Sequence, residues 1–165
     1  MPKPKNKAFV KKEVNLSAVH AGKPLPAVPD KRVGVVVSEW NPEITGVLRD
    51  GCMQVLEEAG LRDVTCVYVP GSFELPFAAQ QLIRKDGMDA VICLGCIIQG
   101  ETRHFEFIAQ ACAQGIMQVG LDNNTPVIFG VLTTQDMAQA KDRAGGAHGN
   151  KGVEAAYTCI KMLSM

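Results

Sequence analysis

An alternation of short apolar runs with amphipathic stretches, repeated four times between residues 32 and 165, constrains the fold of this chain more than any other feature. The first run, Val33–Val37, is β-branched and bounded by polar residues, which is typical of a strand buried on both faces. Apolar residues then recur at helical spacing from Ile44 to Ala59 and stop at Gly60. Strands that alternate with helices in this way pair in parallel and are joined by right-handed crossovers.

The same reasoning places the remaining elements. Further strands are expected at Val64–Val69, Ala90–Leu94 and Val127–Leu132, and further helices through Leu75–Arg84, Phe105–Ile116, Met137–Ala144 and Val153–Leu163. The sequence therefore predicts an α/β fold, a three-layer α/β/α sandwich of flavodoxin-like type around a central parallel four-stranded sheet. In such sheets, ligands bind outside the carboxyl ends of the strands.

Residues 1–30 differ in composition from the rest of the chain. This segment mixes lysines and prolines without a sustained period and is predicted to be an extended N-terminal arm, which leaves residues 31–165 as one folded domain. Seventeen basic residues balance seventeen acidic ones, so no strong field favours nucleic acid or an anionic membrane as a partner. Neither a secretory signal nor a membrane span of roughly 20 apolar residues is expected. The six scattered cysteines are interpreted as buried free thiols in a reducing cytoplasm.

Chemically distinctive residues follow each of the four strands. Together they would bring an aromatic ring, a carboxylate, a Gly/Thr turn and a histidine to one rim of the sheet. The four segments are Ser38–Asn41 with the only tryptophan, Pro70–Glu74, Gly95–His104, and Thr133–Thr134 preceded by Phe129.

The segment Gly95–His104 is the most informative of these. Its glycine spacing nearly matches a nucleotide P-loop, but Glu101 stands where the phosphate-binding lysine belongs, which argues against a nucleoside triphosphate. Gly100, Glu101 and Thr102 are expected to open a helix, whose free N–H groups and dipole suit a small phosphate. Thr102 as a simple helix cap is an equally good interpretation. His104, expected one turn into that helix, is a candidate proton shuttle.

Two other motifs allow more than one interpretation. Cys93 and Cys96 have the spacing of a redox or zinc pair, but Cys93 belongs to a predicted strand and no second ligand pair is present, so neither is expected. The glycine-rich stretch from Arg143 to Lys151 carries cations that could clamp a phosphate, or it is a solvated connection between helices.

Taken together, these segments resemble the lumazine synthase family over nearly all of residues 32–165. The matching stretches are Val69–Pro76, Gly95–Phe105, Pro126–Thr134, and Asp142 through Gly152. The resemblance implies a transferase that needs no cofactor or metal. It condenses 5-amino-6-(D-ribitylamino)uracil with 3,4-dihydroxy-2-butanone 4-phosphate to 6,7-dimethyl-8-ribityllumazine, the penultimate step of riboflavin biosynthesis.

The resemblance also assigns roles to individual positions. It implies His104 as general acid/base, and Gly100, Glu101, Thr102 and Arg143 as the phosphate site. For the pyrimidine ring and ribityl chain it implies Trp40, Asn41, Ser72, Phe73, Glu74, Ile98, Phe129 and Lys151, with Phe129 arriving from a neighbouring subunit. A homo-oligomer with sites at its subunit interfaces is thus expected, either a pentamer or a shell of twelve pentamers, with riboflavin synthase as a further candidate partner. A non-catalytic flavin carrier or a purely shell-forming protein on the same fold are the alternatives.

Overall fold

The computed structural model describes residues 23–165, so most of the expected N-terminal arm lies outside the described residues. Its main sheet contains β1 (Arg32–Ser38), β2 (Asp63–Val69), β3 (Ala90–Ile98) and β4 (Val127–Thr134) in the order β2-β1-β3-β4, with every pair parallel. The helices are α1 (Pro42–Glu58), α2 (Leu75–Asp86), α3 (His104–Asn123), α4 (Met137–Asp142) and α5 (Lys151–Leu163). A 3-10 turn η2 (Ser72–Glu74) precedes α2, and a small hairpin of β5 (Ala144–Gly146) and β6 (Gly149–Asn150) precedes α5.

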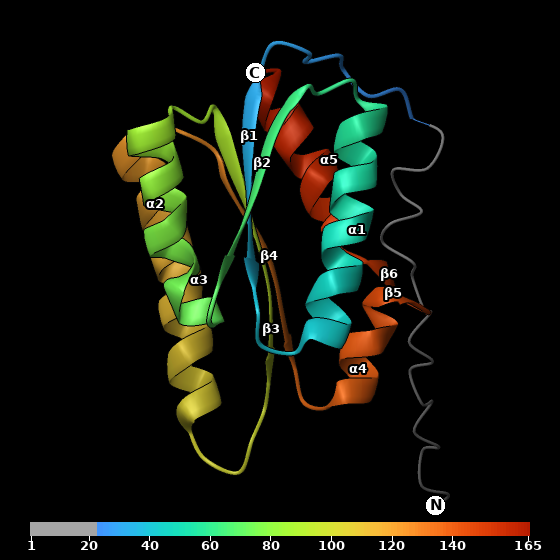
Figure 1. The fold of residues 1–165 in the computed structure, drawn as a ribbon. Coiled ribbons are helices and arrows are strands. Elements are labelled where there is room, and N and C mark those ends of the chain that lie inside the picture. Colours follow the sequence, from blue (N-terminus) through green and yellow to red (C-terminus); the bar gives the residue numbers. More distant parts are fainter. Residues whose placement is uncertain (1–22) are drawn as a thin grey trace, which may run out of the picture.

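The helices form a layer on each side of the sheet (Figure 1). Helices α2 and α3 cover one face, and α1 and α5 cover the other. This arrangement confirms the predicted three-layer α/β/α sandwich of flavodoxin-like type. Within residues 23–165, no helix is both long enough and apolar enough to cross a lipid bilayer.

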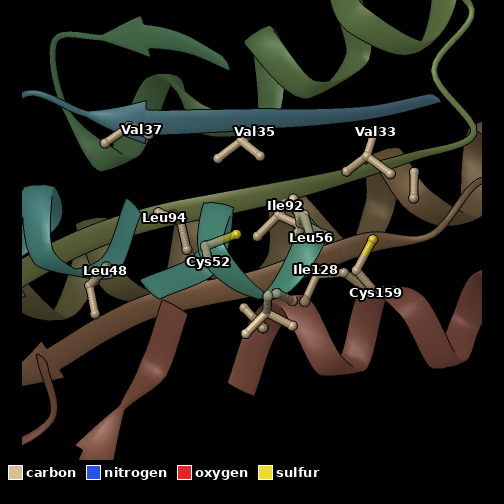
Figure 2. Close-up of a cluster of buried hydrophobic side chains, with 14 of the residues drawn as sticks. Val33, Val35, Val37, Leu48, Cys52, Leu56, Ile92, Leu94, Ile128 and Cys159 are labelled. Atoms are coloured by element: carbon tan, nitrogen blue, oxygen red, sulfur yellow. The ribbon is translucent and has the colours of Figure 1, made fainter. Parts of the chain in front are cut away.

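Successive side chains along each strand point alternately into two separate hydrophobic cores. Val33, Val35 and Val37 face the α1/α5 layer, where they pack with Leu48 and other apolar side chains (Figure 2). Val36 points the opposite way, into the α2/α3 layer. Because burying one such side chain stabilises a fold by about 1.5–3 kcal/mol, a continuous β-branched strand is favoured only where both faces are covered.

Strands β3 and β4 extend two or more residues beyond their predicted carboxyl ends. Strand β3 was expected to end at Leu94, but it continues to Ile98 because β4 pairs with it as far as Thr134. Gly95 therefore lies within a strand instead of ending one. A Cβ at Gly95 would lie only 2.6 Å from the Oγ of Ser72, so glycine allows the β2–α2 turn to approach the sheet closely.

Helix α3 also differs from its predicted bounds. It begins at His104 instead of Gly100, and it continues past Ile116 to Asn123. Its C-terminal cap is Asn124, which adopts a left-handed conformation with φ 48°. The sequence-based end at Ile116 was wrong because the buried stripe continues to Val119, among exposed apolar residues such as Met117 and Leu121 that obscure it in the sequence.

The cysteines occupy the two cores as free thiols. Cys93 faces the α2/α3 core and Cys96 the α1/α5 core, because residues three apart on a strand point to opposite faces. Burial raises the pKa of Cys96 to about 11, and it also raises the pKa of Cys93. These two thiols cannot meet, and no cluster of metal-ligating side chains is found among residues 23–165.

Thiol reactivity should follow this burial. In the folded protein we expect Cys66, which is half-buried, to react first with a thiol reagent, and the buried thiols to react at least about 100-fold more slowly, since they need local opening of the fold. Time-resolved mass spectrometry of the modified peptides measures these rates. Cys66→Ala is the control and should remove the fast phase. Rapid modification of Cys93 or Cys96 would contradict the buried assignment.

Candidate active site

The carboxyl ends of the strands surround a pocket of about 530 Å³. It lies where the β1–α1, β2–α2 and β3–α3 junctions meet, the position expected for a ligand site in a parallel sheet. The structure brings eight of the predicted residues together in its walls. They are Trp40, Ser72, Phe73, Glu74, Ile98, Gly100, Thr102 and His104.

Aromatic side chains form the open side of this pocket. Trp40 is 72% exposed and Phe73 is 58% exposed, although both are large apolar groups. Exposed rings at the mouth of a pocket are suited to stack on a planar ligand, because ring–ring contact removes apolar surface from water. The pocket therefore fits a flat heteroaromatic molecule.

The β2–α2 turn carries the carboxylate of the site. Gly71 is extended, and the N–H of Glu74 donates to the carbonyl oxygen of Gly71 at 3.2 Å, which closes the η2 turn. The Glu74 carboxylate bends back over Gly71, where a Cβ would lie 3.0 Å from Oε2. Ser72 is buried beneath it. This turn offers a carboxylate and a hydroxyl to the polar edge of a ligand.

Residues Gly100, Glu101 and Thr102 form a turn between β3 and α3. Their backbone N–H groups make no hydrogen bond to any part of residues 23–165, and a Cβ at Gly100 would meet open space. Thr102 Oγ1 accepts a hydrogen bond of 3.4 Å from the N–H of His104, so Thr102 also contributes to capping. Glu101 is exposed in the same turn without lining the pocket. The free N–H groups and the dipole of a 20-residue helix make the turn suitable for an anion.

His104 is the first residue of α3, not one turn into it as predicted. The difference arises because Arg103 serves as the N-cap, and the N–H of Glu106 donates to its carbonyl oxygen. His104 thus lines the pocket beside the Gly100–Thr102 turn instead of lying behind it. An imidazole at this place can exchange protons with a bound ligand.

Asn41 belongs to the same rim, but its side chain is engaged within the protein. Its amide donates to the carbonyl oxygen of Cys96 at 3.0 Å. Its own carbonyl oxygen accepts hydrogen bonds from the N–H groups of Ile44 and Thr45 at the start of α1. Asn41 therefore joins the β1–α1 junction to β3.

Three predicted residues lie away from the pocket. Phe129 and Lys151 line a second groove of about 810 Å³ between α3, β4 and α5. Lys151 forms an ion pair of 3.1 Å with Glu154. Arg143 ends α4 and lines neither hollow, and its guanidinium donates to the carbonyl oxygen of Gln139 at 3.2 Å.

Asn150 is a supporting residue that the sequence analysis missed. Its Oδ1 caps α5 by accepting hydrogen bonds from the N–H groups of Gly152 at 2.8 Å and Val153 at 3.3 Å. Its amide donates to the carbonyl oxygen of Val47 on α1. An asparagine directly before an apolar helical stripe is a recognisable N-cap signal, and here the cap fixes the helix start that carries Lys151.

The family model for 6,7-dimethyl-8-ribityllumazine synthase matches residues 30–165. The chain belongs to this family. Proteins named 6,7-dimethyl-8-ribityllumazine synthase are similar to it over most of their length. The one from Cytophaga hutchinsonii is 55% identical over 85% of this chain and 89% of the relative. Those from Porphyromonas gingivalis and Bacteroides fragilis are 47% and 46% identical, over 86% and 80% of this chain and 89% and 94% of each relative.

Membership confirms the resemblance that the four sequence segments indicated. Two of those segments, Val69–Pro76 and Gly95–Phe105, meet at the pocket in this family member, where they combine a carboxylate, a Gly/Thr turn and a histidine with the exposed ring of Trp40. The third segment, Pro126–Thr134, places Phe129 in the second groove. The fourth, from Asp142 to Gly152, packs against α1 and leads into α5. The predicted site residues of a single chain therefore lie on more than one surface.

Proposed function

We propose that this chain condenses 5-amino-6-(D-ribitylamino)uracil with 3,4-dihydroxy-2-butanone 4-phosphate to give 6,7-dimethyl-8-ribityllumazine. The observation that carries the proposal is the pocket at the sheet edge, where the family's residue types converge in a family member. The amine of the pyrimidine forms an imine with the ketone and releases water. Loss of inorganic phosphate and ring closure with release of a second water complete the product.

The pocket residues supply binding and proton transfer for these steps. Trp40 and Phe73 stack on the pyrimidine, and Ser72, Glu74 and the backbone around Ile98 hold its polar edges and the ribityl chain. The Gly100–Thr102 turn receives the phosphate. His104, at the start of the same helix, exchanges protons with the departing oxygen atoms. Much of the acceleration comes from holding the two reactants in contact.

The primary test mixes the purified chain with both substrates and follows lumazine absorbance together with phosphate release. Product above the uncatalysed rate, with one phosphate released for each lumazine, supports the proposal. No turnover with tight binding of riboflavin or lumazine would instead indicate a flavin carrier. The three bacterial relatives that carry the synthase name make turnover the expected result.

Replacing His104 with alanine should lower kcat by about 10-fold or more, toward the modest end of general acid–base effects. KM for both substrates should change little, because the imidazole acts mainly on proton transfer in the transition state and not on substrate binding. Steady-state kinetics across pH values measures this. His104→Gln is a control that keeps a polar side chain at the helix start, and it should be as slow as alanine. A kcat equal to that of the unmodified chain would remove His104 from the mechanism.

The division of the predicted residues supports a site shared between two copies. Phe129 and Lys151 line the groove between α3, β4 and α5, whereas the pocket is lined by the junctions that follow β1, β2 and β3. Apolar rings are also exposed on α2 and α3, with Phe77 67% and Phe107 60% accessible. Two different faces of one chain that bind each other form head-to-tail contacts, which give a ring when the rotation between neighbouring copies closes. A pentamer is the ring that the resemblance implies, and a shell of twelve pentamers is its larger form.

A mixing experiment tests the shared site. One variant carries Glu74→Gln with His104→Ala, and the other carries Phe129→Ser with Lys151→Ala. Each alone should be nearly inactive, but randomly co-assembled copies should recover about a quarter of the sites, because half of each face remains intact. Activity after unfolding and refolding an equimolar mixture measures the recovery. Recovery of none would place all four side chains in the site of one chain.

Cellular context completes the proposal. The six free thiols fit a reducing compartment such as the cytoplasm. Riboflavin synthase, which would consume the product, is the candidate partner enzyme. Light scattering distinguishes a free pentamer from the larger shell in which a partner could be enclosed.

A further inference from the structure

Trp40 stands between two residues that are each hydrogen-bonded to a different strand. Before it, the N–H of Glu39 donates to the carbonyl oxygen of Val69 on β2 at 2.8 Å. After it, the side-chain amide of Asn41 donates to the carbonyl oxygen of Cys96 on β3 at 3.0 Å. The backbone on both sides of the tryptophan is therefore fixed, while its ring remains largely exposed at the mouth of the pocket.

Asn41 has an uncommon backbone conformation. Its φ is 58° and its ψ is 57°, in the left-handed region. Among the non-glycine residues between 23 and 165, only Asn41 and Asn124 have a positive φ. Asparagine enters this region more readily than other residues with a side chain. The left-handed turn reverses the chain between β1 and α1, and it sets the direction in which Trp40 leaves the backbone.

The bond from Asn41 to Cys96 fills a gap in the sheet. Strand β1 pairs with β3 as far as Val37 and Leu94, and then β1 ends at Ser38 while β3 continues to Ile98. The carbonyl of Cys96 lies beyond this paired part. The side-chain amide of Asn41 donates to this carbonyl where the backbone of β1 no longer pairs with β3. A buried carbonyl is costly to leave without a donor, so the bond ties the turn to a rigid strand.

We propose that Asn41 is a positioning residue, which fixes Trp40 at the pocket rim through its left-handed turn and its bond to Cys96. The resemblance suggested that Asn41 itself contacts the substrate, but its amide is engaged with β3 and it does not line the pocket. This inference rests on the proposed function only in taking Trp40 as the platform for the pyrimidine ring. A ring that is already oriented binds a ligand with a smaller loss of conformational freedom.

The sequence provides a direct reporter, because Trp40 is the only tryptophan. Time-resolved fluorescence anisotropy of the ligand-free protein therefore measures the motion of this side chain alone. Asn41→Gly keeps the left-handed conformation accessible and removes the amide. We expect the amplitude of the fast nanosecond component to rise at least about twofold. KM for the pyrimidine should rise by about 3- to 10-fold with kcat nearly unchanged, the effect of ordering one side chain on binding.

A matched control comes from the other left-handed asparagine. Asn124→Gly makes the same substitution at the end of α3 and should leave the anisotropy of Trp40 unchanged. Asn41→Asp is the second variant, in case the glycine variant folds poorly. It keeps the shape but places an oxygen against the Cys96 carbonyl, and it should loosen Trp40 in the same way.

The two readouts separate this inference from the proposed function. Anisotropy unchanged in both Asn41 variants, or changed equally in Asn124→Gly, overturns the positioning role whether or not the enzyme turns over. A looser Trp40 with an unchanged KM for the pyrimidine overturns its link to binding. Absence of turnover in the unmodified chain defeats the proposed function instead, and the anisotropy result then decides the positioning role alone.

Discussion

Replacing Arg143 with alanine is expected to raise KM for the sugar phosphate by about 10- to 100-fold while KM for the pyrimidine changes little. A guanidinium binds phosphate through paired, charge-assisted hydrogen bonds. Each hydrogen bond to a charged group contributes about 1.5–3 kcal/mol, which corresponds to this range. Among residues 23–165, the guanidinium of Arg143 is hydrogen-bonded only to the carbonyl oxygen of Gln139, so little has to be broken for it to bind a phosphate.

Kinetics with each substrate varied in turn measures the effect. Lys141→Ala is a matched control, since it removes one positive charge from the same helix, where Lys141 forms an exposed ion pair of 3.5 Å with Glu43. Exposed ion pairs contribute little, so KM for the sugar phosphate should stay unchanged in this variant. An equal rise in both variants would show a general effect of charge. An unchanged KM in Arg143→Ala would exclude Arg143 from the phosphate site.

The layers of the fold were predictable from the sequence because the signals are local. The β-branched run Val33–Val37 and the helical stripe that ends at Gly60 each specify one element, and their alternation specifies parallel pairing. The end of β3 was not predictable in this way. Gly95 looks like a terminator, but it is needed for the approach of Ser72, a contact between segments distant in sequence.

The place of the candidate site was predictable from the sequence, but the positions of all its residues were not. The rule that ligands bind at the carboxyl ends of strands located Trp40, Glu74 and His104 on one pocket. It could not show that Phe129 faces a different groove. Phe129 lies on β4, and the position of β4 at the edge of the sheet is known only from the strand order. Nor could it show the bond from Asn41 to Cys96, which joins residues 55 apart.

Gly152→Ala is expected to be the most damaging single substitution for folding, with the free energy of unfolding reduced by about 3 kcal/mol or more. A Cβ at Gly152 would overlap the backbone carbonyl of Leu48 on α1, and it would lie 2.9 Å from the α-carbon of that residue. Backbone atoms cannot rotate away as the end of a side chain can. The two helices would have to separate, which would also break the hydrogen bond from Asn150 to Val47.

Urea unfolding followed by circular dichroism, at a fixed protein concentration, measures the decrease in the free energy of unfolding. The matched control is Gly46→Ala on the facing helix, where a Cβ would meet nothing within 4 Å. That variant should be more stable than the parent by about 0.5–1 kcal/mol, since alanine favours a helix. The two substitutions are chemically identical, so opposite signs would isolate the α1–α5 contact as the cause. A Gly152→Ala variant as stable as the parent would mean that α1 and α5 do not approach this closely. Because α5 begins at Lys151, the close contact between Gly152 and α1 also sets the position of the Lys151 ammonium group on the β4/α5 side.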